Sequence, residues 1–315
     1  MTAPVEPGAG ARVPCYGPTV VEGRLRIVQL NAGSLLEPRW DARRHEIVAW
    51  IDRLAPDVVC LQEVWQSDGH PNTAGWIVEH LADGGWSWAF GGAPFAETVW
   101  RDASLHFGSA VLSRWPVEHT LHLLPVASDD DPFLAGVPWE LMHARTAGLD
   151  VFSTHLVAPP TGGVHRLLQV VALDELVRAA RGALDEVPPF GTTRAGMPAI
   201  VCGDFNAEPD SDEIRFLTSL HAIDGRTAFY QDAWRMAGRG QGLTQDWRTN
   251  DIAAAMNLHR KRIDYVFVGD PFQREGSAGR VLDAQLAFHE PITGTVASDH
   301  SGLVVDIVWP DRPPG

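Results

Sequence analysis

Two kinds of apolar pattern alternate along the chain, and together they predict a layered α/β protein. Short apolar runs rich in β-branched residues and bounded by turn residues are typical of buried strands. Longer stretches with apolar positions three and four residues apart are typical of amphipathic helices. Strands are expected at residues 25–30, 57–63, 86–90, 107–113, 117–124, 139–146, 149–154, 199–202, 262–268, 280–288 and 302–309, and helices at 38–55, 72–82 and 164–182.

Local signals refine these elements. Pro38 suits the first turn of a helix. Pro209, followed by Asp210 and Glu213 at the spacing of a capping box, predicts a helix start. Loops are expected at residues 128–138, 184–196 and 221–260, the last with short helices and a role in substrate selection.

Six strand-associated segments carry, at their ends, residues that can bind a metal ion or handle a proton. In one of them a buried strand at 199–202 is followed by Gly203, which permits a sharp turn. Asp204 and Asn206 come next, two apart, so in extended backbone both side chains point to the same side. Their oxygen atoms suit a hard cation. The full set is Asn31, Glu63, His155, Asp204 with Asn206, Asp264, and Asp299 with His300.

Each of these residues, taken singly, also has a plain structural explanation. Asp and Asn after a strand are ordinary turn formers. A strand-end Glu is more often solvated, and a strand-end His is usually structural. Six such segments in one chain exceed what turn chemistry alone provides, which favours a common site.

Composition narrows the choice of protein class. The 315 residues, 45% of them hydrophobic, suffice for one large core or two modest domains. No run of eighteen apolar residues is present, so no transmembrane helix is expected. Residues 1–22 are rich in Pro and Gly and lack the basic start and apolar middle of a signal peptide, so we expect a flexible arm.

Cysteine content and charge bear on location and partners. The three cysteines, Cys15, Cys60 and Cys202, are too sparse for a disulfide scaffold, so a cytoplasmic location is expected. The formal net charge of −15 disfavours tight binding of double-stranded DNA or RNA. Residues 260–262 form the only three-residue basic cluster.

In their order and local sequence, the polar motifs resemble the endonuclease/exonuclease/phosphatase superfamily. The resemblance extends over about residues 24–308. Each short motif is weak by itself, and the six together are specific. They are Leu61-Gln62-Glu63, Gly108 to Arg114, Ser153 to Leu156, Gly203 to Asn206, Arg262 to Tyr265 and Ser298 to His300.

The resemblance implies a four-layer α/β sandwich, with two packed, mixed and mostly antiparallel sheets and helices outside. A single catalytic domain would span residues 23–310, with the site at one rim between the sheets. The implied activity is hydrolysis of a phosphoester with Mg²⁺ or Mn²⁺. In such a site Glu63 would bind the metal with Asn31 close by, and Asp299 would complete the metal site or brace the cluster.

The resemblance also implies roles in moving protons and binding phosphate. His300 would be the general base, oriented by Asp264. Asp204 would orient the attacking water or protonate the leaving group. Asn206 and His155 would donate hydrogen bonds to the phosphoryl oxygens.

Two features depart from the pattern of the superfamily. Phe107 stands where some nuclease relatives have a tyrosine near the phosphate, which weakens a DNA-repair interpretation. The carboxylate that braces the imidazole equivalent to His155 in some relatives has no clear match, with Glu97 and Asp102 as candidates.

Three functions follow, in order of preference. The first is a metal-dependent phosphodiesterase or phosphatase that acts on a small or lipid-derived phosphoester. We expect a monomer. The second is a nuclease, which needs a basic channel that the composition does not suggest. The third is a non-catalytic binding or scaffold domain, which the full set of site residues disfavours.

Overall fold

The computed structural model describes residues 23–127, 130–181, 194–269 and 274–313. The arm expected at residues 1–22 lies outside this range, as does most of the loop expected at 184–196. Every strand and helix predicted from the apolar pattern is found within a few residues of its expected position.

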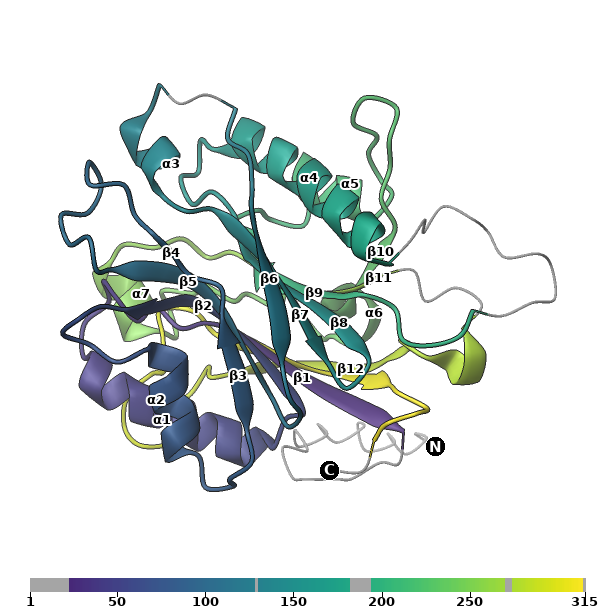
Figure 1. Cartoon of the computed structure of the whole chain (residues 1–315), viewed down its shortest axis with the longest axis horizontal. Helices are drawn as coiled ribbons and strands as arrows, with labels where there is room; N and C mark the ends of the chain where they lie inside the picture. The colour runs from purple at the N-terminus through teal and green to yellow at the C-terminus, as the bar shows by residue number, and fades with distance from the viewer. Residues whose placement is uncertain (1–22, 128–129, 182–193, 270–273, 314–315) are drawn as a thin grey trace, which may run out of the picture.

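Two mixed sheets pack against each other (Figure 1). In the first sheet the order is β12-β13-β1-β2-β5-β3, and β4 also pairs with β5. Its strands are β1 (Arg24–Asn31), β2 (Val58–Gln66), β3 (Ser87–Phe90), β4 (Ala93–Pro94), β5 (His106–Ser113), β12 (Val281–Ala287) and β13 (Gly302–Val308). In the second sheet the order is β10-β11-β9-β8-β7-β6. Its strands are β6 (Glu118–Leu123), β7 (Glu140–Thr146), β8 (Leu149–His155), β9 (Ile200–Asp204), β10 (Tyr230–Asp232) and β11 (Asp264–Gly269).

Helices cover the outer faces of both sheets, which confirms the four-layer sandwich. Helices α1 (Trp40–Leu54) and α2 (Thr73–His80) pack on the first sheet around Trp50 and Ile77. Helices α4 (Gly163–Arg181) and α5 (Asp212–Leu217) pack on the second sheet. A third apolar layer, which includes Cys60 and Cys202, fills the space between the sheets. The shorter helices are α3 (Pro132–Gly136), α6 (Ala233–Ala237), α7 (Asp251–Ala255) and the 3₁₀ turn η1 (Glu275–Ser277).

Each sheet contains one parallel pair of strands among antiparallel ones. In the first sheet β1 and β2 are parallel, and in the second β8 and β9 are parallel. Because parallel strands run in the same direction, their carboxyl ends meet at one edge of the sheet. The polar strand ends found in the sequence are therefore brought together.

Three local expectations were wrong. The segment 128–138 is not all loop, because Asp131 accepts hydrogen bonds from the backbone of Phe133 and Leu134 and so caps α3. Helix α5 has no capping box: it begins after Ser211, and Glu213 instead pairs with Arg166 at 3.0 Å. The segment 221–260 contains, besides two short helices, the edge strand β10.

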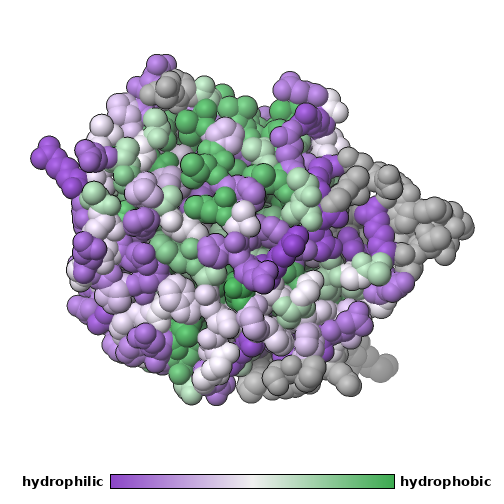
Figure 2. Space-filling view, viewed as in Figure 1, coloured by the Kyte–Doolittle hydropathy of each residue, from purple (hydrophilic) through white to green (hydrophobic). Residues whose placement is uncertain are grey.

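The outer face of α4 carries exposed apolar residues alongside the charged Glu175. Val164 is 57% exposed and Leu168 43% exposed. Figure 2 shows hydrophobic surface over this part of the molecule. Within the described ranges, no helix combines the length and the apolar character needed to span a membrane.

An ionic cluster ties β7, β8 and α4 together. The Asp150 carboxylate is 2.8 Å from His143 Nε2 and 3.2 Å from Arg145 Nε, and it also accepts a hydrogen bond from Arg181. Burial opposes ionisation of Asp150, but the bonds from His143 and Arg181 outweigh it and lower the pKa from 3.8 to about 2.

Replacing Asp150 should therefore destabilise the protein in a pH-dependent way. A carboxyl whose pKa is lowered in the folded state stabilises the fold above its unfolded pKa and loses this contribution as pH falls toward the folded value. We expect Asp150→Asn to lower the free energy of unfolding by about 1–2 kcal/mol at neutral pH, allowing for solvent screening. The deficit should shrink as pH falls from near 4 toward 2. Urea unfolding over a pH series measures this, with exposed Asp68→Asn as control, and a deficit that does not depend on pH would contradict it.

Candidate active site

Strands of both sheets bring the predicted site residues to one rim of the sandwich. Asn31 ends β1, and His155 and Asp204 end the parallel strands β8 and β9, directly opposite each other in register. Asp264 opens the antiparallel strand β11 and lies opposite Asp204. His300 lies just before β13. The structure thus brings the polar strand ends found in the sequence together at one rim.

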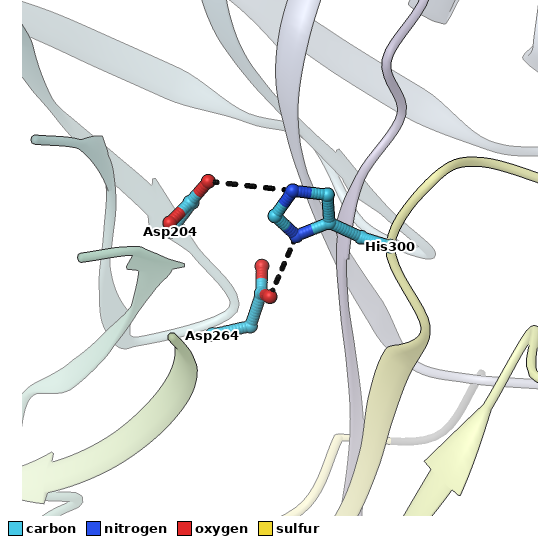
Figure 3. Close-up of side chains that lie close together, drawn as sticks. All are labelled: Asp204, Asp264 and His300. Atoms are coloured by element: carbon cyan, nitrogen blue, oxygen red, sulfur yellow. Dashed lines mark hydrogen bonds and ion pairs between the residues drawn. The ribbon is translucent and has the colours of Figure 1, made fainter. Parts of the chain in front are cut away.

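His300 lies between carboxylates from two strands (Figure 3). Its Nδ1 is 2.8 Å from Asp264 Oδ2, and its Nε2 is 3.9 Å from Asp204 Oδ2 and 3.7 Å from Asp299 Oδ2. Burial by itself would lower the pKa of His300, but Asp264, Asp299 and Asp204 together raise it well above its usual value. The imidazole is thus oriented by Asp264 and is a strong proton acceptor.

Asp204 is bound from three directions. Its Oδ2 accepts a hydrogen bond from Asn31 Nδ2 at 3.0 Å and lies 3.6 Å from His155 Nε2, while its Oδ1 accepts one from the backbone of Asn206 at 2.8 Å. Burial, and then the charge of Asp264, raises the pKa of Asp204. Burial lowers the pKa of His155. Asp204 therefore binds its proton more tightly than usual, and His155 favours the neutral imidazole.

Glu63 lies within a second group of carboxylates on the other side of Asn31. Its Oε1 accepts a hydrogen bond of 2.9 Å from Asn31 Nδ2. Burial, with the charges of Glu37 and Asp299, raises the pKa of Glu63 well above its usual value. Three carboxylates therefore lie near one another here. Glu63 comes from β2, Glu37 from the β1–α1 connection and Asp299 from the segment before β13.

The sequence predicts that Glu63 ends its strand, and the structure places it before the end. Strand β2 continues to Gln66, and the register with β5 shifts between Leu61 and Val64. Glu63 has φ 54°, in the left-handed region. A β-bulge re-aims side chains locally, so the bulge turns Glu63 toward the site without ending the strand.

The extended geometry expected for Asp204 and Asn206 was also wrong. Asn206 has φ 48°, so the chain has already turned, and its Nδ2 donates to the carbonyl of Leu156 at 3.0 Å. The amide links the ends of β8 and β9.

The two candidate braces for His155 are not its partners. Glu97 and Asp102 are both exposed, and Asp102 accepts hydrogen bonds from Ser104. Among the described residues, the carboxylate within ion-pair distance of His155 is that of Asp204. Trp139 contacts the same imidazole edge-on, with ring centroids 5.9 Å apart.

Three residues of the site were not identified from the sequence. Glu37 belongs to the carboxylate group and is 8% exposed, but an acidic residue before a helix is common for reasons of the helix dipole. Gln245 Nε2 is 3.2 Å from His300 Nε2, and it comes from the irregular segment 221–260. Arg43 is fully buried and binds backbone carbonyls on two loops of the site.

The donor atoms at this rim suit a divalent cation. Asp204, Asp264 and His300 each offer one ligand atom, and these atoms lie within 4.8 Å of one another. The Nδ1 of His300 is already engaged by Asp264, however, so this group also has the geometry of a proton-handling triad. The other group, Glu37, Glu63 and Asp299, offers hard oxygen donors of the kind that Mg²⁺ and Mn²⁺ prefer. Glu37 Oε2 is buried and has no hydrogen-bond partner among the described residues, which leaves it free for a cation.

Comparison of the sequence with protein-family models identifies the family to which the chain belongs. The model of the Endonuclease/Exonuclease/phosphatase family matches residues 28–300. The chain belongs to this family. Its members hydrolyse phosphoesters, and their fold is the sandwich described above.

Individual relatives agree with this assignment. The structure of truncated Caenorhabditis elegans TDP2 is 19% identical with a TM-score of 0.61, covering 90% of this chain and 97% of that one. The human Nocturnin catalytic domain with bound sulfate is 18% identical with a TM-score of 0.61, covering 92% and 96%. The 2',5'-phosphodiesterase 12 of Rattus norvegicus is 26% identical over 171 residues, which are 50% of this chain and 26% of that protein. The chain thus matches about a quarter of that curated relative.

Removing the carboxylate that orients His300 should lower the pKa of this histidine. Asp264 raises the pKa of His300 through charge and a hydrogen bond. In Asp264→Asn the pKa should fall, because the charge and the hydrogen bond that stabilise the imidazolium are lost, as measured by NMR titration of the imidazole in the metal-free protein. His289, whose pKa is lowered by burial, serves as internal control. An unchanged His300 curve would show that the pair does not set its protonation.

Proposed function

We propose that the protein is a divalent-metal-dependent phosphodiesterase or phosphatase, in which an activated water attacks phosphorus in line with the leaving oxygen. The observation that carries the proposal is the position of His300. It is bound to Asp264 through Nδ1, while Nε2 faces Asp204 and Asp299. A base oriented through Nδ1, with Nε2 directed at the acidic groups and at Gln245, is placed to remove a proton from water.

Metal ligands and proton-handling groups divide between the two parts of the rim. Glu63 and Asp299 would hold Mg²⁺ or Mn²⁺ with Asn31 beside them, and the ion would neutralise charge on the phosphoryl oxygens. Asn31 Nδ2 binds Glu63 and Asp204 at once, which fixes the distance between the two parts. The charge of Asp299 would be partly neutralised in the loaded site, so His300 would then release its proton more readily than in the metal-free protein.

The remaining side chains are placed to bind the leaving oxygen and the oxygens of the phosphoryl group. Asp204, whose pKa is raised, would orient the attacking water or protonate the leaving oxygen. His155, neutral because burial lowers its pKa, would donate a hydrogen bond to a phosphoryl oxygen. Asn206 would donate its second N–H in the same way, since its first binds Leu156. These oriented donors stabilise the charge that develops in the transition state.

A small or lipid-derived phosphoester is the substrate class that we propose, because the net charge of −15 repels extended polyanions. A nuclease is the second candidate. The D. rerio TDP2 structure, 16% identical with a TM-score of 0.61, contains a single-stranded DNA product, and a short single strand needs less basic surface than a duplex. The monomeric state and the cytoplasmic location stay predictions.

Loss of the base or of Asp204 should abolish turnover. We expect folded His300→Ala and Asp204→Ala proteins to lose about 10²–10⁴-fold in rate. The assay compares Mg²⁺ with EDTA on bis-nitrophenyl phosphate, nitrophenyl phosphate, sphingomyelin, inositol phosphates, single-stranded DNA and a 2',5'-linked dinucleotide. His119→Ala, an exposed histidine on β6, is the matched control. Full metal-dependent turnover in either variant would rule out the proposed roles, and the preferred substrate decides between the two candidates.

Substitution of Glu63 should change the response to metal. In Glu63→Gln the charge is lost while the shape is retained, so the Mg²⁺ concentration for half-maximal activity should rise about 10-fold or more. Saturating metal should restore part of the rate. Exposed Glu79→Gln is the control. An unchanged metal titration would remove Glu63 from the ligand set.

A further inference from the structure

One oxygen of the buried Glu37 carboxylate has no hydrogen-bond partner among the described residues. The residue is 8% exposed and lies in the connection between β1 and α1. Its Oε2 is buried and accepts no hydrogen bond from any described group. Burial, and then the charge of Asp299, raises the pKa of Glu37. The backbone N–H of Glu37 and the charge of Arg43 act in the opposite sense. The buried oxygen that has no hydrogen-bond partner still carries a cost to the fold.

The nearest cation cannot relieve this cost by a direct bond. Arg43 has five N–H donors, and main-chain carbonyls take all five. Its Nε binds Pro38, its Nη1 binds Ala32 and Ala297, and its Nη2 binds Gly33 and Glu37. The bond to Glu37 is to the backbone oxygen, at 3.1 Å, so Arg43 acts on the Glu37 carboxylate through its charge alone.

The free oxygen of Glu37 faces the space shared with Asp299. A Cβ built on Gly33 would lie 3.1 Å from Glu37 Oε2 and 2.8 Å from Asp299 Oδ1. Both carboxylates therefore border the same point, which is open because residue 33 has no side chain. Gly33 has φ 51°, so the backbone conformation also favours glycine here. Glu63 belongs to the same group through its charge interactions with Glu37 and Asp299.

We propose that Glu37 is a further carboxylate ligand of the divalent cation held by Glu63 and Asp299. The inference rests on the proposed function, since it adds a residue to the cation site assumed there. The cation would supply the partner that Glu37 Oε2 lacks among the described residues. A third carboxylate would in turn strengthen the attraction of the site for a divalent ion. Its side chain acts on the cation and not on the proton transfer by His300.

Direct binding of Mn²⁺ to the full chain tests the proposal without an activity assay. Isothermal titration calorimetry gives the dissociation constant, and the thermal midpoint with and without Mn²⁺ gives an independent readout. We expect Glu37→Gln to raise the Kd about 10-fold or more and to reduce the Mn²⁺-induced rise in midpoint. The metal-free midpoint should rise or stay unchanged, because a like charge has left a buried cluster.

Two further variants make the test specific. Glu140 is a buried carboxyl whose pKa is raised well above its usual value by burial, so Glu140→Gln changes little charge and should leave the Kd unchanged. Glu37→Asp keeps the charge but shortens the side chain by one methylene, so it should also weaken binding, and it replaces Glu37→Gln if that variant does not fold.

The outcomes separate this inference from the proposed function. If Glu63→Gln weakens Mn²⁺ binding and both Glu37 variants bind like the parent, the inference is overturned and the cation site stands. If Glu63→Gln also binds like the parent, or the parent does not bind Mn²⁺, the cation site itself is overturned and the inference with it. A lower metal-free midpoint with an unchanged Kd would identify Glu37 as a structural residue, which also overturns the inference.

Discussion

The structure depends on how it tolerates a concentration of negative charge at one buried rim. Five carboxylates, those of Glu37, Glu63, Asp204, Asp264 and Asp299, lie near two cationic groups, Arg43 and His300. The consequence is visible in the raised pKa of three of the carboxyls and of the imidazole. Such an arrangement lowers the stability of the metal-free fold, and it persists because the surrounding structure fixes it and because a proton and a cation can occupy it.

Arg43 is the residue that most directly fixes this rim. Its guanidinium joins the β1–α1 connection, through carbonyls such as that of Ala32, to Ala297, which precedes Asp299 and His300. A rigid planar group with five donors can hold several carbonyls at once, which a lysine cannot do. Arg43 thus places two loops that carry acidic residues without neutralising those residues through direct bonds.

The fold class and the clustering of polar strand ends could be predicted from the sequence, and the reason is topological. Asn31 ends a strand of the parallel pair in the first sheet, and His155 ends a strand of the parallel pair in the second. Parallel strands end at a common edge of their sheet, so a pattern of polar strand ends carries three-dimensional information. The spacing of apolar residues likewise predicted the positions of the strands and of the longer helices.

The parts that could not be predicted depend on single backbone conformations or on distant partners. Glu63 and Asn206 both adopt a positive φ, which no period of two or of 3.6 residues encodes. Glu37 and Gln245 belong to connections where polar residues are normal, and only the folded chain brings them to the rim. Arg43 is a charged residue of a helix, a position that is usually solvated, whereas its side chain is fully buried among carbonyls from both loops.

The carboxylates proposed to bind the cation and the residues proposed to transfer the proton come from different sheets. The proposed reaction therefore depends on the relative position of the two sheets. Glu63 belongs to the first sheet, whereas Asp204 and Asp264 belong to the second. Asn31 spans the junction by binding Glu63 and Asp204, and His300 spans it by binding Asp264. A buried hydrogen bond also crosses between the sheets, because Gln62 Nε2 donates to Ser153 Oγ at 3.0 Å. Within the first sheet the same amide donates to Gln29 Oε1 at 3.1 Å.

Apolar packing between sheets is tolerant of small sliding movements, because it is not directional. Hydrogen bonds fix distance and angle. The amides that join the sheets therefore convert a tolerant interface into one with a defined register. That register sets how far the carboxylates that suit a cation lie from the imidazole that suits a proton, and so whether one phosphoryl group can contact both.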